Sequence, residues 1–250
     1  MKKTLFLTTL LSVLVCAAII AQPKGNTAPP TENSPLNSAT FNGLSLRNVG
    51  PAVTSGRILD IAVNPENHSE YYLATAGGGV WKTNNSGITF SPVFDEEGSF
   101  SVGCITLDPN NPNVVWVGSG ENNNQRSVSY GDGIYKSENG GKNFKNMGLK
   151  SSEHIGMIAV DPHNSDIVYV AAYGPLWSDG GDRGIYKTTD GGKTWKQILN
   201  VSDKTGFNEI HIDPVNPEIL YACAHQRRRH EWTYISGGPE SAIYKSTDEG

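Results

Sequence analysis

The chain has 250 residues, of which 37% are hydrophobic and 18% charged, and its formal net charge is −5 at pH 7. The apolar share is sufficient for a buried core, and the acidic balance argues against nucleic acid or anionic lipid as the main partner. The 28 glycines and 14 prolines indicate many turns and short strands.

Residues 1–21, MKKTLFLTTLLSVLVCAAIIA, have the layout of a secretory signal peptide, in which two lysines precede an apolar run that ends at Ala21. A lipid anchor on Cys16 is disfavoured because the preceding Val15 is bulky. A retained membrane helix is disfavoured because the apolar run is short for a bilayer. We therefore expect a secreted, periplasmic or cell-surface protein with no membrane insertion after cleavage, and a mature net charge of −7.

Residues 22–44 are rich in Pro, Asn, Ser and Thr and predict a disordered linker. The two cysteines that follow, Cys104 and Cys223, lie in unlike sequence contexts. We interpret them as buried thiols rather than as a disulfide.

From residue 56 onward the sequence repeats itself, and the repeat is the strongest indicator of the fold. One landmark starts at Asn64, Asp108, Asp161 and Asp213, each time with Pro second and Asn fourth. A second landmark places Lys after an aromatic residue and then a turn, and its copies are residues 79–90, 133–144, 184–195 and 242–250.

Each repeat predicts four short strands, which in the third repeat are 155–161, 167–173, 184–188 and 195–199. They are rich in β-branched and aromatic residues and are bounded by turn residues. Tandem units of four antiparallel strands are typical of a β-propeller. The predicted fold is therefore all-β, a partial propeller over residues 45–250. Its four blades are expected at about 56–95, 100–148, 154–199 and 207–250. We expect the chain to be incomplete, because it stops within the fourth turn and a propeller ring must close.

The second landmark resembles the Asp-box, or BNR repeat, Ser/Thr-x-Asp-x-Gly-x-Thr-Trp/Phe. This motif is found in sialidases, sortilin-type propellers and some xyloglucan-cleaving glycoside hydrolases. The third copy matches it throughout, from Thr188 to Trp195. The Asp position is filled in the four copies by Asn85, Asn139, Asp190 and Asp248. Large secreted bacterial proteins described as BNR or sortilin-like look most similar overall.

Asparagine at two of these four positions argues against a catalytic role, because an amide cannot replace a carboxylate in acid–base chemistry. Both residues can accept hydrogen bonds from the backbone of their own turn. A phosphate cradle is disfavoured because no helix follows the glycines. We interpret the four positions as structural.

Because antiparallel strands alternate in direction, the Asp-Pro turns and the Asp-box turns should share one face of the propeller. The opposite face should carry the dissimilar loops 77–79, 119–133, 174–184 and 225–241. Ligands usually bind at such loops, and their aromatic and hydrogen-bonding side chains suit a sugar or an extended peptide. The alternative is that these loops only pack against parts of the protein outside this chain.

The ligand-binding candidates on the loop face are Arg57, Asn122, Arg126, His154, Tyr173, Trp177, His225, Arg227 and Trp232. For Arg57, a salt bridge to a neighbouring strand competes with a ligand carboxylate. Glu121 and Glu209 are candidates for a glycosidase acid/base pair. No His, Cys or Asp spacing predicts a metal site, and no cofactor is expected.

The resemblance weighs against catalysis in this portion. Sialidases have an early Arg-Ile-Pro motif, but here Leu59 follows Arg57 and Ile58. Xyloglucan-cleaving propellers place a catalytic aspartate where this chain has Ala76, and a methyl group cannot take a proton. We therefore predict non-catalytic binding of extracellular carbohydrate or peptide. The alternative is a glycoside hydrolase with its acids on the loop face or in further blades. A third possibility is a scaffold that docks a C-terminal domain of the same protein.

Overall fold

The computed structural model describes Gly43 and residues 56–250. The predicted signal peptide (1–21) and, apart from Gly43, the predicted linker (22–44) lie outside the described residues. The chain divides into two compact units, Met1–Asn48 and Val49–Gly250, and every described strand belongs to the second.

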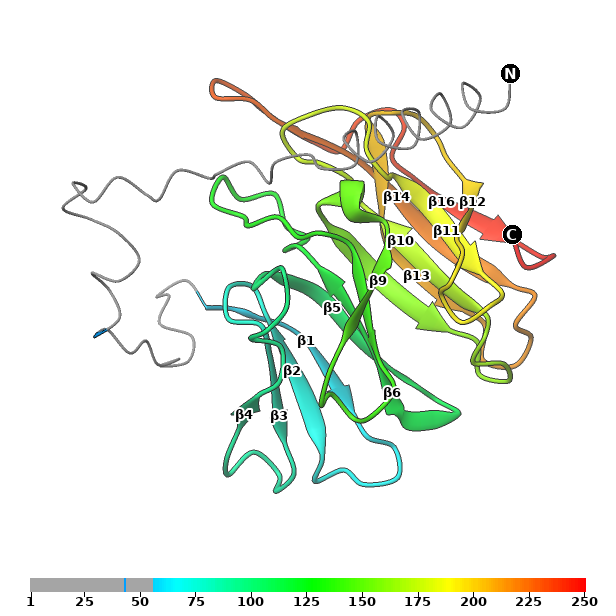
Figure 1. Ribbon diagram of the computed structural model, residues 1–250. Coiled ribbons are helices and arrows are strands. Elements are labelled where there is room, and N and C mark those ends of the chain that lie inside the picture. Colours follow the sequence, from blue (N-terminus) through cyan, green and yellow to red (C-terminus); the bar gives the residue numbers. More distant parts are fainter. Residues whose placement is uncertain (1–42, 44–55) are drawn as a thin grey trace, which may run out of the picture. The chain divides into compact units, whose positions relative to one another are not determined.

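Four antiparallel sheets follow one another along the chain as the four blades of a β-propeller (Figure 1). Blade 1 contains β1 (Ile58–Val63), β2 (Tyr71–Thr75), β3 (Val80–Thr83) and β4 (Ser91–Pro92). Blade 2 contains β5 (Val102–Asp108), β6 (Asn111–Ser119), β7 (Ile134–Ser137) and β8 (Lys145–Gly148). Blade 3 contains β9 (Ile155–Val160), β10 (Val168–Ala172), β11 (Gly184–Thr188) and β12 (Lys196–Leu199). Blade 4 contains β13 (Thr205–Ile212), β14 (Leu220–Arg229), β15 (Tyr234–Ser236) and β16 (Ala242–Ser246). The one helical segment among the described residues is the 3-10 turn η2 (Lys150–Ser152). The all-β propeller prediction is therefore confirmed.

The innermost strands β1, β5, β9 and β13 lie side by side, each in contact with the next. Each of them has a β-bulge at the same position, occupied by Leu59, Gly103, Gly156 and Asn208. At two of these positions glycine is required because a larger side chain would clash with the backbone of the next blade. A Cβ on Gly103 would lie 2.3 Å from the Ile155 carbonyl oxygen, and one on Gly156 would lie 2.5 Å from that of Asn208. The blades thus meet backbone to backbone near the axis.

The hydrophobic core consists of three clusters, one at each junction between blades. Tyr72 and Val117 belong to the cluster between blades 1 and 2. Trp116 and Ile158 belong to the next cluster, and Tyr169 with Phe207 to the third. Burial of apolar area between sheets, rather than within a sheet, therefore holds the blades together.

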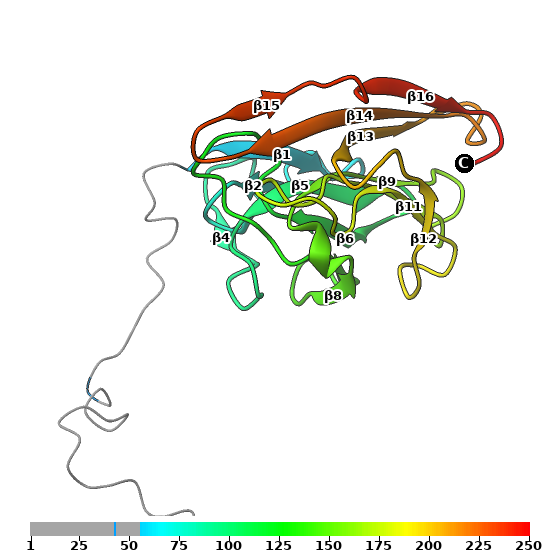
Figure 2. The same cartoon turned by 90° about the horizontal axis from the view of Figure 1, so that it is seen from above.

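Blade 4 departs from the prediction of a loop over residues 225–241. Instead, β14 continues through Arg229 and pairs with β15, with Arg228 opposite Ile235. The lower part of β14 pairs with β16 in the ordinary way. Figure 2 shows β15 and β16 one after the other along β14. The predicted loop is a β-ribbon that lengthens the strand toward the loop face.

We call the face that carries the turns of the two sequence landmarks the turn face, and the opposite face the rim face. On the turn face the two turns of each blade are joined by one backbone hydrogen bond. Its donors are the amides of Ser86, Gly140, Gly191 and Glu249, and its acceptors are the carbonyls of Ser69, Asn113, Asp166 and Glu218. The bond is the same in all four blades, as expected for alternating strand direction.

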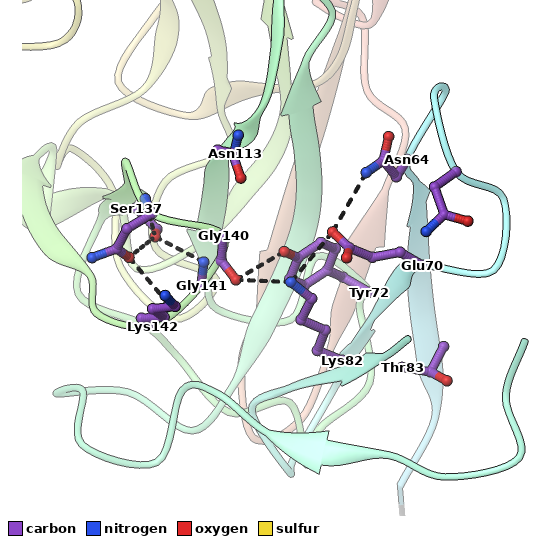
Figure 3. A network of polar contacts seen from close by, with 12 residues as sticks. Asn64, Glu70, Tyr72, Lys82, Thr83, Asn113, Ser137, Gly140, Gly141 and Lys142 are labelled. Atoms are coloured by element: carbon purple, nitrogen blue, oxygen red, sulfur yellow. Dashed lines mark hydrogen bonds and ion pairs between the residues drawn. The ribbon is translucent and has the colours of Figure 1, made fainter. Parts of the chain in front are cut away.

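A lysine–aromatic pair links each of blades 1 to 3 to the turn of the next blade, and Figure 3 shows the pair of blade 1. In blade 1, Lys82 Nζ lies 5.0 Å from the centre of the Tyr72 ring and donates a 3.1 Å hydrogen bond to the Gly140 carbonyl of blade 2. The Tyr72 hydroxyl donates to the same carbonyl at 3.0 Å. Lys136 and Lys187 repeat the contact toward Gly191 and Glu249. The turn face therefore serves the joining of blades.

Candidate functional site

The rim face centres on residues 122–124 of blade 2, which reach toward all three other blades. Asn122 Nδ2 donates to the Gly156 carbonyl of blade 3 at 3.0 Å. Asn124 Nδ2 donates to Ser236 Oγ of blade 4 at 3.0 Å. Asn123 hydrogen-bonds Glu121, which in turn binds Arg57 of blade 1. These side chains tie the four blades together across the rim.

Glu121 is the buried end of an ion pair with Arg57. The carboxylate is 2% exposed and the arginine side chain 41%. Arg57 Nε donates to Glu121 Oε1 at 2.8 Å, and Nη2 contacts the same oxygen. The salt bridge that competed with a ligand role for Arg57 is therefore present in the structure. Arg57 and Asn123 both bind one oxygen of the carboxylate, so Glu121 already has partners within the chain.

Tyr173, His225 and Arg227 form a second cluster where β10 and β14 end. The Arg227 guanidinium carbon lies 3.4 Å from the centre of the Tyr173 ring, and the Tyr173 hydroxyl bonds His225 Nδ1. Arg227 Nη1 donates to the Asn123 carbonyl at 2.7 Å. Burial raises the pKa of Tyr173 to about 12 and lowers that of Arg227 to about 10. Three predicted candidates thus lie in one network with the asparagine run.

His154 lies beneath this network, 2% exposed, and its Nδ1 has no hydrogen-bond partner among the described residues. Burial, and then the charge of Arg227, lower the pKa of His154 to about 3. The ring is therefore neutral at physiological pH. Its closed surroundings suit a packing role better than contact with a ligand.

The remaining rim candidates are exposed. Trp232 is 81% exposed and its ring stacks on His230 at 5.4 Å between centroids and 12° between planes. Trp177 is 42% exposed, and Arg126 also lies at the surface. Rings held open to solvent in this way are suited to stacking on flat, apolar faces of a ligand.

Glu121 and Glu209, the candidate acid/base pair, have different partners in the structure. Glu209 lies in the middle of β13, half-exposed, with its Oε2 3.5 Å from His211 Nε2 and 3.9 Å from the Cys223 sulfur. These partners belong to blade 4 itself. The two carboxylates share no hydrogen-bond or ion-pair partner within residues 56–250. Neither cysteine forms a disulfide, and Cys223 is only partly buried, contrary to the prediction of two buried thiols.

Sequence reasoning missed Asn123, Asn124 and Ser236, which complete the rim network. The sequence signal that could have pointed to the asparagines is the run Glu121–Gln125, in which three asparagines lie between a glutamate and a glutamine. The contacts of Asn124 with Ser236 and of Asn123 with Arg227 join residues 112 and 104 positions apart, so the pattern alone could not assign them.

On the turn face, the four positions interpreted as structural, Asn85, Asn139, Asp190 and Asp248, form hydrogen bonds within their own turns. Asn85 Oδ1 accepts from the Thr89 amide at 3.0 Å and Asn139 Oδ1 from the Asn143 amide at 3.2 Å. Asp190 Oδ1 accepts from the Thr194 amide at 2.9 Å. Hydrogen bonds from Thr194 hold the pKa of the Asp190 carboxyl far below its usual range. In the fourth copy, Ser246 Oγ donates to Asp248 Oδ1 at 2.7 Å.

Hollows also lie outside the rim. A groove of about 500 Å³ on the turn face separates Asn139 from Asp190. An apolar hollow of about 240 Å³ lies between blades 3 and 4, beside Ile198 and Leu220. Within residues 56–250, no group of three or more His, Cys, Asp and Glu side chains is placed to hold a metal ion. No helix in that range is long and apolar enough to cross a membrane.

No protein-family model matches the chain. Its curated relatives include an oligoxyloglucan-reducing end-specific xyloglucanase from Emericella nidulans, 22% identical over 218 residues, which cover 80% of this chain and 24% of the relative. A xyloglucanase from Hypocrea jecorina is 26% identical over 187 residues, 66% of this chain and 21% of the relative. The chain thus spans less than a quarter of the length of these two enzymes.

Solved structures also resemble the propeller. An ancestral GH74 enzyme superposes with a TM-score of 0.59 at 20% identity, covering 78% of this chain and 25% of that one. The GH74 xyloglucanase from Xanthomonas campestris superposes with a TM-score of 0.55 at 18% identity, covering 76% and 28%. The four blades resemble part of a GH74 propeller fold.

Proposed function

We propose that this propeller is the polysaccharide-binding part of an extracellular glycoside hydrolase that acts on a xyloglucan-like β-glucan. The observation that carries the proposal is the exposed Trp232 ring, which stacks on His230 in the turn between β14 and β15. Sugar rings bind to such a platform through their apolar faces, while neighbouring amides and arginines bind hydroxyl groups. The xyloglucanases among the relatives favour this hydrolase alternative over the non-catalytic binding that the sequence first suggested.

The catalytic pair of this hydrolase is not Glu121 with Glu209 in our proposal. Glycoside hydrolysis needs two carboxyl groups flanking one bond, one of them able to donate a proton. Glu121 is buried and bound to Arg57, whereas Glu209 is bound within blade 4. Glu209→Gln should therefore leave hydrolysis of xyloglucan unchanged in the full protein.

The Asp-box and sortilin-like assignment and the extracellular location are likewise proposals. The first is supported by the shared hydrogen bonds of Asn85, Asn139, Asp190 and Asp248. The second is supported by the signal-like sequence of residues 1–21.

A binding experiment tests the proposed function directly. Isothermal titration calorimetry with xyloglucan oligosaccharides should show binding to the wild-type chain. The affinity of Trp232→Ala should be at least tenfold weaker, because a ring that stacks on an aromatic side chain contributes on the order of 1–3 kcal/mol. Ile88→Ala is the matched control, since Ile88 is 82% exposed on the turn face. No heat of binding, or equal loss in both variants, would contradict the proposal.

Binding without hydrolysis is the second candidate function, favoured by Ala76. This residue is 4% exposed at the end of β2, where the resemblance to xyloglucan-cleaving propellers places an aspartate. Release of reducing ends from xyloglucan by the full protein separates the two candidates. Release supports the hydrolase, and binding with no release supports the non-catalytic protein.

A further inference from the structure

A pocket of about 200 Å³ opens on the rim face beside the Trp232 platform, and nothing above accounts for it. It is lined by Asp179, Lys204, Gln226, Arg228, His230 and Ile235, with Arg227 also contributing. His230, one of its walls, is also the residue on which Trp232 stacks. A sugar bound to the Trp232 ring would therefore lie next to this pocket.

The lining is cationic in an acidic protein. Three of its side chains are basic, one is acidic, and the chain as a whole has a net charge of −5. Lys204 is exposed at the mouth, whereas Arg227 is 1% exposed and binds carbonyl and amide oxygens rather than a carboxylate. A hollow with a local excess of positive charge attracts anions from solution.

Arg228 has unused hydrogen-bonding capacity in this pocket. Its Nε and Nη1 are out of contact with solvent, and neither has a hydrogen-bond acceptor among the described residues. Asp179 Oδ1 lies 3.4 Å from Nη1, as an ion pair without an aligned hydrogen bond. Buried donors without acceptors are rare in folded proteins. Arg228 lines the pocket and its side chain is 21% exposed, so its guanidinium can meet a carboxylate there through a charge-assisted hydrogen bond.

Asp179 and Glu240 lie near the pocket and compete only weakly with an incoming anion for Arg228 and Lys204. Asp179 is 46% exposed, so water screens its charge. Glu240 lies close enough to Lys204 for that lysine to lower its pKa, after the larger effect of hydrogen bonds from Ser202 and Thr205. Those two hydroxyls already satisfy Glu240. Lys204 and Arg228 thus keep charge available for a ligand.

We propose that this pocket is a subsite for a carboxylate, carried by a uronic acid unit of the polysaccharide. The carboxylate binds Arg228 and Lys204 while its own or the adjoining sugar ring lies on Trp232. The assignment of this carboxylate to a uronic acid unit rests on the proposed polysaccharide-binding function, whereas the binding of a carboxylate by Arg228 does not. The predicted ligand is therefore an acidic glycan, which goes beyond the xyloglucan named for the relatives.

The test is an NMR titration of the isotope-labelled chain with D-glucuronate, D-glucose and inorganic sulfate, following the Nε–H signal of Arg228. Glucuronate should shift this signal, glucose should not, and sulfate should bind more weakly than glucuronate. Arg228→Gln should weaken glucuronate binding about tenfold and Lys204→Met about threefold. Lys196→Met, an exposed lysine outside the pocket, is the matched control.

Asp179→Asn provides a readout that a purely structural arginine would not give. Removal of the competing acid should strengthen glucuronate binding two- to threefold. An unshifted Arg228 signal, or sulfate binding as tight as glucuronate, would overturn the carboxylate subsite even if neutral xyloglucan oligosaccharides bind at Trp232. Glucuronate binding in a chain that binds no oligosaccharide would support the subsite and contradict the proposed function.

Discussion

The turn face repeats one set of hydrogen bonds in all four blades, whereas on the rim face no two blades share a loop. The amide-to-carbonyl bond from Gly140 to Asn113 recurs in every blade at 2.8–3.1 Å. On the rim, by contrast, Asn123 of blade 2 accepts from Arg227 of blade 4, a contact with no counterpart elsewhere among the described residues. Variation between the repeats is thus concentrated on the rim face, where the contacts between blades differ from one pair of blades to the next.

The comparison also shows that the rim is not loosely built. Arg227 is 1% exposed and Glu121 2%, and both bind residues of other blades. The variable loops therefore rest on a buried polar layer. Only the outer side chains, such as Trp232 and Arg126, are free to meet a ligand.

The largest expected effect is a loss of stability when a glycine on the turn face gains a methyl group. Gly192, at φ +94°, lies on the turn face, and a Cβ there would sit 2.6 Å from Trp116 Cη2. We expect Gly192→Ala to lower the free energy of unfolding by about 3 kcal/mol, from backbone strain plus overpacking. Gly77→Ala on the rim is the control, since no atom lies within 4 Å of its added Cβ. Urea unfolding curves measure both, and equal losses would contradict the difference between the faces.

The second effect is a dependence of stability on pH through His154. Its pKa is about 3 in the folded protein and about 6.5 when unfolded, so the unfolded chain binds more protons between these values. The contribution of the neutral His154 ring to the free energy of unfolding is fully present above pH 6.5, and it is lost as the pH is lowered toward 3. The expected loss from pH 7 to pH 5 is about 2 kcal/mol. His154→Gln should remove most of this loss, and His163→Gln, at an exposed turn-face position, should keep it. Identical pH profiles for all three proteins would be inconsistent with a buried neutral ring.

A smaller effect separates charge from hydrogen bonding in the turns. Asn139→Asp keeps the acceptor for the Asn143 amide and should change stability by less than about 0.5 kcal/mol, whereas Asn139→Ala should cost about 1 kcal/mol. Thermal unfolding of the two variants checks this. A large loss in Asn139→Asp would show that the amide itself is needed, against our structural interpretation.

The smallest effect on global stability is expected on the rim. Arg227→Met removes the hydrogen bonds to Asn123 and Asn124 but leaves the core intact. Amide hydrogen exchange in residues 121–125 should become faster while residues 137–144 on the turn face stay unchanged. Faster exchange in both segments would indicate that rim and turns are coupled.

Most of the fold could be predicted from the sequence because the same pattern of strands and turns recurs in each of the four repeats. In blade 3 the predicted strand 184–188 agrees with β11, and the predicted strand 155–161 exceeds β9 by one residue. The β14–β15 ribbon was missed because its residues, Arg227–Arg229 and Tyr234–Ser236, are charged or exposed and give no apolar alternation.

The site was less predictable, for a physical reason. Exposed rings such as Trp232 could be named from composition and loop length. The pairing of Arg57 with Glu121, 64 residues apart, and of Arg227 with Asn123, 104 apart, depends on how the blades are arranged around the axis. Such contacts lie outside any local pattern, so Glu121 was interpreted as a possible catalytic acid rather than as the partner of Arg57.

The most direct test of the division between the two faces is hydrogen exchange of the chain with and without saturating xyloglucan oligosaccharide. Our account predicts protection in the rim segments 119–133, 174–184 and 225–241, and none in the turns 83–90, 137–144 and 188–195. Protection in the turns, with the rim unchanged, would contradict it.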